Sequence, residues 1–333
     1  MEIYFNAAVY ERLYSCDYLN ETQWEEYGEK RPLFGSLCII LGTIYLCTYV
    51  PCLVIMRKKE FFEKSCYKIM FLIGCIDILA IVVNSFITGF LLMSGSVFCS
   101  APDLNYFTGL AAVCLWCGEC LACTILALNR FIDFWFPRIS AALFEGRRTY
   151  LWFLVIIAYM LYFAVFTRAT GFSSTSIHWE LDPYANVPRT AVHVDRSVYA
   201  SLPHYVNNLV LIPALFLVYF VLIISISLKG RKAIFKVQRQ LILQSGLIVA
   251  LLFIPGALYT ITEMMQSAPS LLSACALLAW QLGNGGGGLI YLFLNRNIRG
   301  VLSREIDVTM STHSTAIRPT DEMWRKPKQV CKY

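Results

Sequence analysis

Seven long runs of apolar residues, each nearly free of charge, alternate with shorter polar connections along the chain. They cover residues 34–56, 69–93, 106–128, 150–167, 204–228, 241–262 and 271–294. Hydrocarbon offers the backbone no hydrogen-bond partners, so a crossing segment must be a helix, and about 20 residues span its thickness of about 30 Å. The pattern therefore predicts an all-α membrane protein built as a bundle of seven transmembrane helices.

The composition supports a membrane protein. Hydrophobic residues make up 57% of the chain and charged residues only 15%, whereas soluble domains carry about 25% charged residues. The formal net charge of +6 suits a nucleic-acid surface or an anionic membrane surface equally well. The positions of the Lys and Arg residues decide between the two.

Most Lys and Arg residues gather on one side of the predicted membrane. Only six of the 28 fall on the side of the N-terminus. They are Arg12, Lys30, Arg31, Arg168, Arg189 and Arg196. The positive-inside rule then places the N-terminus outside the cell and the C-terminus in the cytoplasm. We expect a multi-pass protein of the plasma membrane, with the lipid bilayer and no nucleic acid as a partner.

The outer segments have two notable features. Residues 1–33 are acidic and lack the apolar core of a signal peptide, so the first run is expected to act as its own insertion signal. The sequon that begins at Asn20 lies in this segment and makes Asn20 a candidate for glycosylation. The longest outer connection, residues 170–203, either folds as a lid over the outer mouth or is a solvated connector.

Residues 295–333 form the predicted cytoplasmic tail. Its first part has apolar residues at helical spacing, which predicts a short amphipathic helix on the inner leaflet. These residues are Ile298, Val301, Leu302 and Ile306. The Ser- and Thr-rich part that follows is a candidate for phosphorylation.

Cys114, Cys117, Cys120 and Cys123 have the spacing of a metal or cluster site. In one helix, however, each step of three residues falls about 60° short of a full turn, so the four thiols spread around half the helix over about 13 Å. They cannot converge on one ion, and buried cysteines commonly act as small hydrophobic residues. We expect no metal and no cofactor.

Cys16 and Cys99 are both predicted to face the oxidising outer compartment, where disulfides form. They are candidates for a disulfide bond. The connection at 170–203 has no cysteine, and Cys275 near the outer end of the seventh run is a competing partner.

Asp77, Glu119 and Asn284 are polar residues at the depth of the hydrocarbon, where charge is costly and commonly functional. Counting from the inner ends of their runs places all three about 12 to 15 Å deep, in one layer. Two carboxyls that meet there cannot both ionise freely, so they would share a proton or a cation. The alternative is a static polar contact that only holds the helices together.

Pro255 and Gly256 interrupt the sixth run and are a candidate hinge. Proline and glycine are common in membrane helices, so an ordinary packing role is the alternative. The four histidines show neither metal nor triad spacing and none lies well inside a run. A retinal protein would need a lysine in the last run, which has none. We expect no enzyme.

Four short motifs, in this order around seven spans, resemble the serpentine chemoreceptors of nematode class T, within the rhodopsin-type G-protein-coupled receptors. They are Arg31-Pro32-Leu33-Phe34-Gly35, Ser65-Cys66-Tyr67-Lys68-Ile69-Met70, Leu126-Ala127-Leu128-Asn129-Arg130 and Leu294-Asn295-Arg296-Asn297-Ile298-Arg299. The resemblance implies a chemosensory receptor for an unknown small molecule or peptide. It would activate a heterotrimeric G protein in sensory neurons, with sensory cilia as a candidate location.

By this resemblance, Asn129 and Arg130 form the G-protein coupling site. Asn129 replaces the acidic residue that usually precedes the arginine, and Asn284 and Tyr291 are separated by glycines instead of an Asn-Pro-x-x-Tyr turn. Arg130 lies three turns after Glu119, on the same helix face, whereas a membrane-surface anchor is the alternative role. A secondary transporter or channel is the alternative function, although the two halves show no internal repeat.

Overall fold

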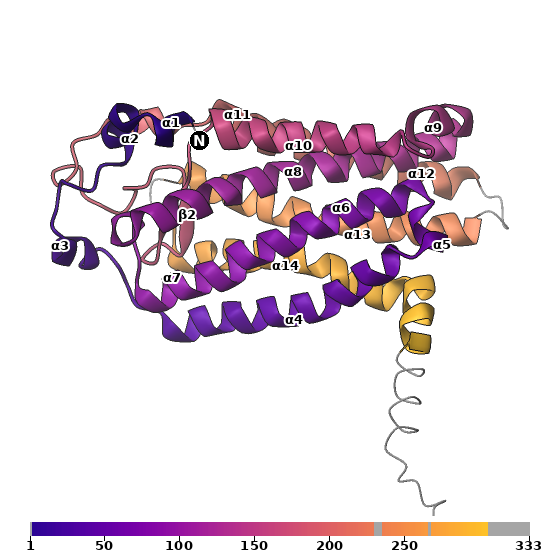
Figure 1. Cartoon of the computed structure of the whole chain (residues 1–333), viewed down its shortest axis with the longest axis horizontal. Helices are drawn as coiled ribbons and strands as arrows, with labels where there is room; N and C mark the ends of the chain where they lie inside the picture. Colours follow the sequence, from indigo (N-terminus) through magenta and orange to yellow (C-terminus); the bar gives the residue numbers. More distant parts are fainter. Residues whose placement is uncertain (1, 230–234, 266–267, 306–333) are drawn as a thin grey trace, which may run out of the picture.

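The computed structural model describes residues 2–229, 235–265 and 268–305. Seven long helical segments run along a common axis (Figure 1). In chain order they are α4 (Pro32–Met56); α6 (Ser65–Ile81) with η1 (Val82–Ile87) and α7 (Thr88–Ser94); α8 (Pro102–Trp135); α10 (Thr149–Phe166); α11 (Leu202–Val206) with η4 (Asn207–Leu211) and α12 (Ile212–Lys229); α13 (Phe235–Met264); and α14 (Ser270–Leu294). Each predicted run overlaps one of these segments.

Six of the segments in the described part of the chain are long and apolar enough to cross a membrane. The seventh, α14, has 25 residues and no charged side chain, but Gln281, Asn284 and its glycines lower its hydropathy. Polar and small residues of this kind are common where a membrane helix faces other helices. The composition of α14 therefore reflects its place inside the bundle.

Several helices extend beyond the predicted runs. The third run was predicted to end at residue 128, but α8 continues to Trp135, and Pro137 follows directly on its cap at Phe136. The sixth run was predicted to end at 262, whereas α13 reaches Met264 and includes Glu263. Hydropathy marks the hydrocarbon layer, and a helix stops only where its backbone bonding or a proline ends it.

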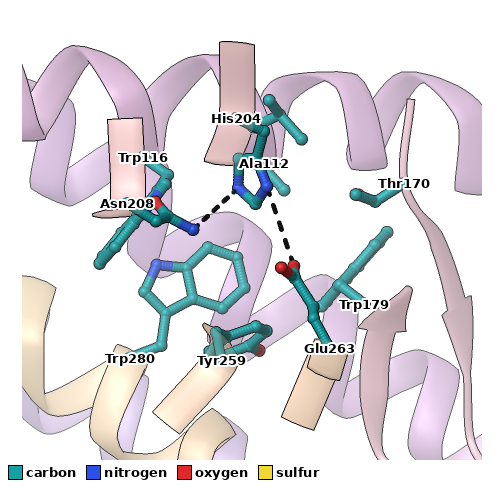
Figure 2. A pocket seen from close by; sticks show the side chains of 10 residues that line it. Ala112, Trp116, Thr170, Trp179, His204, Asn208, Tyr259, Glu263 and Trp280 are labelled. Atoms are coloured by element: carbon teal, nitrogen blue, oxygen red, sulfur yellow. Dashed lines mark hydrogen bonds and ion pairs between the residues drawn. The ribbon is translucent and has the colours of Figure 1, made fainter. Parts of the chain in front are cut away.

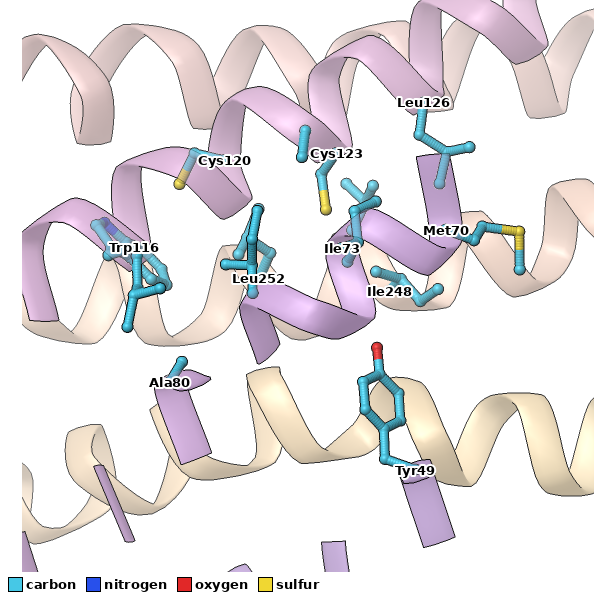
Figure 3. Packing of buried hydrophobic residues seen from close by; sticks show 14 of the residues in the cluster. Tyr49, Met70, Ile73, Ala80, Trp116, Cys120, Cys123, Leu126, Ile248 and Leu252 are labelled. Carbon is cyan, nitrogen blue, oxygen red and sulfur yellow. The ribbon is translucent and has the colours of Figure 1, made fainter. Parts of the chain in front are cut away.

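The core is centred on α8, which packs against α6, α10 and α12 and is buried along most of its length. Figure 3 shows Trp116, Cys120, Cys123 and Leu126 of α8 pointing toward residues of the neighbouring helices. The thiols of Cys120 and Cys123 thus fill space in an apolar core. By contrast, α10 lies at the outside of the bundle and buries only Thr149, Ile156 and Phe163.

The glycine run of α14 forms a groove against α4. A Cβ atom on Gly285 would lie 2.1 Å from the Tyr45 ring, and one on Gly288 would lie 2.3 Å from the Tyr49 ring. These contacts require residues without a side chain, which lets the two helices approach closely. Tyr49 is fixed in this groove and stacks on Tyr291, with ring centroids 5.9 Å apart.

One end of the bundle, here called the lid end, carries the N-terminal segment and a β-hairpin (Figure 1). The N-terminal segment contains α1 (Glu2–Phe5), α2 (Ala7–Tyr14) and α3 (Glu21–Glu25). The antiparallel strands β1 (Gly171–Ser173) and β2 (His178–Glu180) pair Phe172 with Trp179. Short helical turns η2 (Phe98–Ser100) and η3 (Arg196–Tyr199) complete this end.

Hydrogen bonds attach the hairpin to the helices below it. Phe172 N donates to Asn105 Oδ1 at 3.2 Å, Ser174 N donates to Ser96 O at 3.0 Å, and Trp179 Nε1 donates to Thr88 Oγ1 at 3.0 Å. The connection at 170–203 is therefore folded onto the bundle and is not a solvated connector. We call its hairpin the lid.

A second apolar cluster and a disulfide hold the N-terminal segment beside the lid. Tyr14 and Trp24 pack with Phe98, Tyr184 and their neighbours. In the structure Cys16 is bonded to Cys99, the pair considered from the sequence, and Cys275 is a free, exposed thiol. The bond joins the N-terminal segment to η2, directly before α8.

The opposite end, here called the tail end, carries α5 (Lys59–Phe62), α9 (Pro137–Phe144) and a helix over residues 296–305. Ile298 and Val301 of this helix are buried in the main core, and Lys58 Nζ lies 2.5 Å from Glu305 Oε1. The predicted amphipathic helix therefore packs its apolar face on the bundle. Ile306 and the candidate phosphorylation sites lie outside the described residues.

We expect Cys16→Ser, Cys99→Ser and the double variant to lower the melting temperature of the purified protein equally. Each removes the same cross-link, which closes a loop with a sequence separation of 83 residues, a constraint worth roughly 2 to 4 kcal/mol. A thermal melt in detergent measures the effect, with the exposed Cys275→Ser as the matched control. Single variants that melt at the same temperature as the parent protein would contradict the bond. So would single variants whose decreases in melting temperature add up in the double variant.

Candidate functional site

The three polar residues predicted to share one layer meet in the middle of the bundle. Asn284 Nδ2 donates to Glu119 Oε2 at 2.7 Å and to Asp77 Oδ1 at 3.2 Å. All three side chains are almost fully buried. We call this group the midplane layer. Since an amide nitrogen carries two N–H bonds, Asn284 satisfies one oxygen of each carboxyl.

The layer contains more residues than the sequence analysis named. Asn84 Nδ2 donates to Asn284 Oδ1 at 2.8 Å, Ser85 Oγ donates to Asn84 Oδ1 at 2.9 Å, and Gln281 Nε2 donates to Asn84 O at 2.8 Å. The hydroxyl of Tyr49 donates to Asp77 Oδ2. Asn84 lies two helical turns after Asp77, so its place on the same helix face could have been predicted from the sequence. No sequence feature indicated that Tyr49 would join the layer.

Local backbone geometry helps to form this network. Asn84 and Ser85 lie in η1, a π-helical segment, and π-bulges are frequent at functional sites. Tyr49 reaches Asp77 because the glycines of α14 leave room for its ring. The Asp77 and Glu119 carboxyls also lie close enough to interact directly. Two adjacent buried carboxyls cannot both carry a full charge, so the layer can hold one shared proton or a cation.

A pocket lies between the midplane layer and the lid, and Figure 2 shows its lining. It encloses about 40 Å³, which is room for about three water molecules. Its walls are Ala112, Val113, Trp116, Thr170, Trp179, His204, Asn208, Tyr259, Glu263 and Trp280. We call it the lid pocket. Aromatic rings with a few converging polar groups are the usual composition of a small-molecule site.

The polar groups of the lid pocket converge from three helical segments. Trp116 Nε1 donates to Asn208 Oδ1 at 2.8 Å, and Asn208 Nδ2 lies 3.5 Å from His204 Nε2. His204 Nδ1 lies 3.8 Å from Glu263 Oε1, which is too far for a hydrogen bond (Figure 2). Asn208 belongs to η4, a second π-helical segment, in which the neighbouring Asn207 is buried as well.

A larger cavity of about 530 Å³ lies beside the lid, between the hairpin and the ends of α11, α13 and α14. We call it the vestibule. Its polar lining includes His178, Glu180, Asp182 and Arg196, and Glu263 lines both this cavity and the lid pocket. Burial lowers the pKa of His178 to about 4 and raises the pKa of Glu180 to about 7. His178 is therefore neutral at physiological pH.

Sequence reasoning missed both Glu263 and His204. Their side chains are only 6% and 9% exposed, although each lies at the end of its helix and not at midplane depth. Their burial comes from the lid that covers the ends of α11 and α13. Glu263 is the only charged residue between Arg239 and Arg296, a signal that was available.

The candidate hinge lies directly against the lid pocket. Pro255 is inside α13, which continues past it. A Cβ atom on Gly256 would lie 2.7 Å from Ile212 Cδ1 and 3.4 Å from Trp116 Cζ2. Gly256 thus lets α13 approach α8 and α12 where the pocket begins.

Arg130 is buried at the tail end, with 8% of its surface exposed. Its guanidinium lies near Cys66 of α6 and Tyr219 of α12, and Nε and Nη2 have no hydrogen-bond partner in the described part of the chain. Asn129 Nδ2 donates to Ser65 Oγ at 3.3 Å. The Arg130 side chain thus points into the bundle, whereas an arginine that anchors a helix at the membrane surface extends to lipid headgroups.

Asn20 is exposed at the lid end and caps α3. Its Oδ1 accepts from Gln23 N at 2.9 Å and from Thr22 Oγ1 at 2.8 Å. Glycosylation would use Nδ2, so the cap and a glycan are compatible.

Comparisons with known proteins give one consistent answer. Residues 2–314 match the family model described as serpentine type 7TM GPCR chemoreceptor Srt. Serpentine receptor class T-55 of Caenorhabditis elegans is 25% identical over 292 residues, which cover 86% of this chain and 78% of that protein. Both matches confirm the resemblance predicted from the four motifs.

The crystal structure of squid rhodopsin matches the fold, with a TM-score of 0.59 at 11% sequence identity, over 93% of this chain and 94% of that one. This confirms the predicted seven-helix bundle. The family match covers nearly the whole chain and describes a multi-pass membrane receptor, which is not an enzyme. The chain therefore belongs to the serpentine type 7TM GPCR chemoreceptor Srt family, the nematode class T receptors.

Proposed function

We propose that this receptor binds an extracellular ligand at the lid end and activates a heterotrimeric G protein at the tail end. The observation that carries the proposal is the sequence of contacts along α8. This one helix lines the lid pocket with Trp116, joins the midplane layer through Glu119 and holds Arg130 at the tail end. A ligand that shifts α8 can therefore bias all three places together.

The proposed orientation puts the lid outside the cell and the tail in the cytoplasm. The excess of Lys and Arg at the tail end supports it, as does the Cys16–Cys99 bond at the lid end, because disulfides persist in oxidising compartments. Under this orientation Asn20 is accessible for glycosylation. The family supports a place in the plasma membrane, and we propose the cilium of a sensory neuron as its location.

At the tail end we propose that Arg130 contacts the G protein. A guanidinium offers five N–H donors in a planar fork, and carbonyl groups at the C-terminal end of an incoming helix are suitable acceptors. Its Nε and Nη2 atoms, which have no hydrogen-bond partner among the residues described, are then available to such a helix once the surrounding helices separate. Asn129 would support the site through its bond to Ser65.

Between the two ends we propose that the midplane layer changes its proton or cation occupancy when the receptor switches. It joins three helical segments, α6 with η1, α8 and α14, through side-chain hydrogen bonds. A change in the charge of Asp77 or Glu119 would alter which hydrogen bonds form and hence how these helices pack. The Pro255–Gly256 site would accommodate the movement of α13.

The proposed topology is tested with epitope tags. A tag before Met1 should be reached by antibody on intact cells, whereas a tag after Tyr333 should need permeabilisation. The reverse pattern would exclude an extracellular lid. A parallel measurement of substrate flux distinguishes a receptor from the transporter or channel alternative, since a receptor changes nucleotide exchange without flux.

Arg130→Lys and Arg130→Ala should both reach the cell surface and lose most agonist-driven nucleotide exchange, by at least tenfold. Lysine keeps the charge but lacks the planar fork. The agonist comes from a compound screen that reads calcium or cyclic nucleotide, and exchange is measured on a co-expressed heterotrimer. Arg138→Lys, at an exposed site near the same end, is the matched control. A fully active Arg130→Lys receptor would exclude Arg130 from the coupling site.

Asp77→Asn and Glu119→Gln should leave surface expression largely intact and change basal or evoked signalling. Each substitution keeps the side-chain shape but removes a carboxyl group that can bind a proton or a cation. Thr43→Ala, which removes an exposed hydroxyl of α4 that donates to Ile39 O of the same helix, is the control and should signal normally. Normal signalling by both acid variants would leave the layer with a structural role only.

A further inference from the structure

The charge of the lid pocket and vestibule points to one class of ligand. Three carboxylate residues line the two cavities, Glu180, Asp182 and Glu263, and Arg196 is the one Lys or Arg among their described lining residues. Arg196 lies 3.5 Å from Asp182 and donates to Val187 O at 2.5 Å. Its charge is therefore used within the lid. Glu180 and Glu263 have no Lys or Arg partner in the described lining, and the contact of Glu263 with a basic side chain is the one with His204, whose Nδ1 lies 3.8 Å from Oε1.

Of these two carboxylates, Glu263 has the less favourable environment. Its side chain is 6% exposed, and its Oε2 atom has no hydrogen-bond partner among the described residues. A buried carboxylate with an oxygen that has no hydrogen-bond donor is unfavourable, and the 3.8 Å contact of Oε1 with His204 is too long to be a hydrogen bond. Glu180 interacts with it electrostatically and adds negative potential to the same region. A bound cation would relieve both.

The rings beside Glu263 are suited to hold such a cation. Figure 2 shows Trp116, Trp179, Tyr259 and Trp280 around the space that the Glu263 carboxylate faces. Tyr259 and Trp280 meet edge to face with centroids 5.8 Å apart, which fixes both rings. The faces of aromatic rings attract cations, most strongly where water is excluded.

We propose that the ligand is a small organic amine, with its ammonium group in the lid pocket against Glu263 and its polar remainder in the vestibule near Glu180. The inference rests on the proposed function only in taking the lid pocket as the ligand site. The lid pocket has room for about three water molecules, which suits an ammonium head group. The vestibule, at about 530 Å³, holds the rest.

Two other residues, His178 and Thr262, would help to orient the ligand. His178 stacks on Tyr259 at 4.3 Å and its Nδ1 has no hydrogen-bond partner within the described chain. Thr262 Oγ1 lies 3.4 Å from His178 Nε2. Since His178 lies in the lid and Tyr259 in α13, and their rings are stacked, an amine that contacts this pair would connect lid position to the helix that carries the Pro255–Gly256 site.

Choline and its neutral isostere 3,3-dimethylbutan-1-ol provide the test, since they share shape and differ in charge. The full-length receptor is purified in detergent, and its melting temperature is measured against each compound at fixed pH and ionic strength. Tetramethylammonium and ethanolamine extend the cation set. We expect a saturable rise in melting temperature with at least one cation and none with the isostere at equal concentration.

Glu263→Gln should raise the apparent dissociation constant for the cation at least tenfold, and Glu180→Gln should raise it less. Glu63→Gln, a 66% exposed carboxylate at the tail end, is the control and should change nothing. If Glu263→Gln does not fold, Trp280→Leu should weaken the cation at least tenfold while Trp280→Phe, which keeps a ring, should weaken it less.

An equal response to choline and its isostere, no response to any of the three cations, or full binding by Glu263→Gln would each overturn the amine assignment. The result is separable from the proposed function. Glu263-dependent binding without nucleotide exchange would support the site and count against G-protein coupling. A neutral agonist that drives exchange would support coupling and count against the amine.

Discussion

The amide of Asn284 makes the contact on which the rest of the bundle depends. It donates one N–H to Asp77 and one to Glu119, and its oxygen accepts from Asn84. Leaving either carboxyl buried without such a donor would cost about 1 to 3 kcal/mol, and more if that carboxyl is charged. The positions of α6, α8 and α14 are therefore coupled, because the three side chains must stay within hydrogen-bond distance of one another.

Other features of the bundle follow from this requirement. The glycines of α14 bring α4 close enough for Tyr49 to reach the remaining oxygen of Asp77. The π-helical segment η1 turns Asn84 toward Asn284. Above the layer, the aromatic residues of the lid pocket pack on α8, and below it Arg130 is held on the same helix face as Glu119. A polar centre thus links two sites at opposite ends.

The lid end shows how a chain without a cysteine in the 170–203 connection still fixes its hairpin. The Cys16–Cys99 bond attaches the N-terminal segment to η2, and side-chain and backbone hydrogen bonds attach the hairpin to α7 and α8. The lid in turn buries Glu180 beside Glu263. The acidic character of the pocket is therefore a product of the lid and α13 together, and neither segment produces it alone.

The sequence by itself determined the features that depend on local pattern. Seven apolar runs predicted the seven helices, and four short motifs indicated the family. Helix geometry placed Asp77, Glu119 and Asn284 at one depth because depth depends only on counting residues along each helix. The same geometry placed Arg130 on the face of Glu119.

Only the tertiary structure decided which side chains meet. Glu263 and His204 lie at the ends of predicted runs, where hydropathy cannot tell solvent from a covered pocket, and burial there depends on the lid folding back over α11 and α13. Tyr49 reaches Asp77 only because α14 has glycines at the contact. Contacts between residues far apart in the chain depend on the spacing and rotation of whole helices, and no local pattern encodes these.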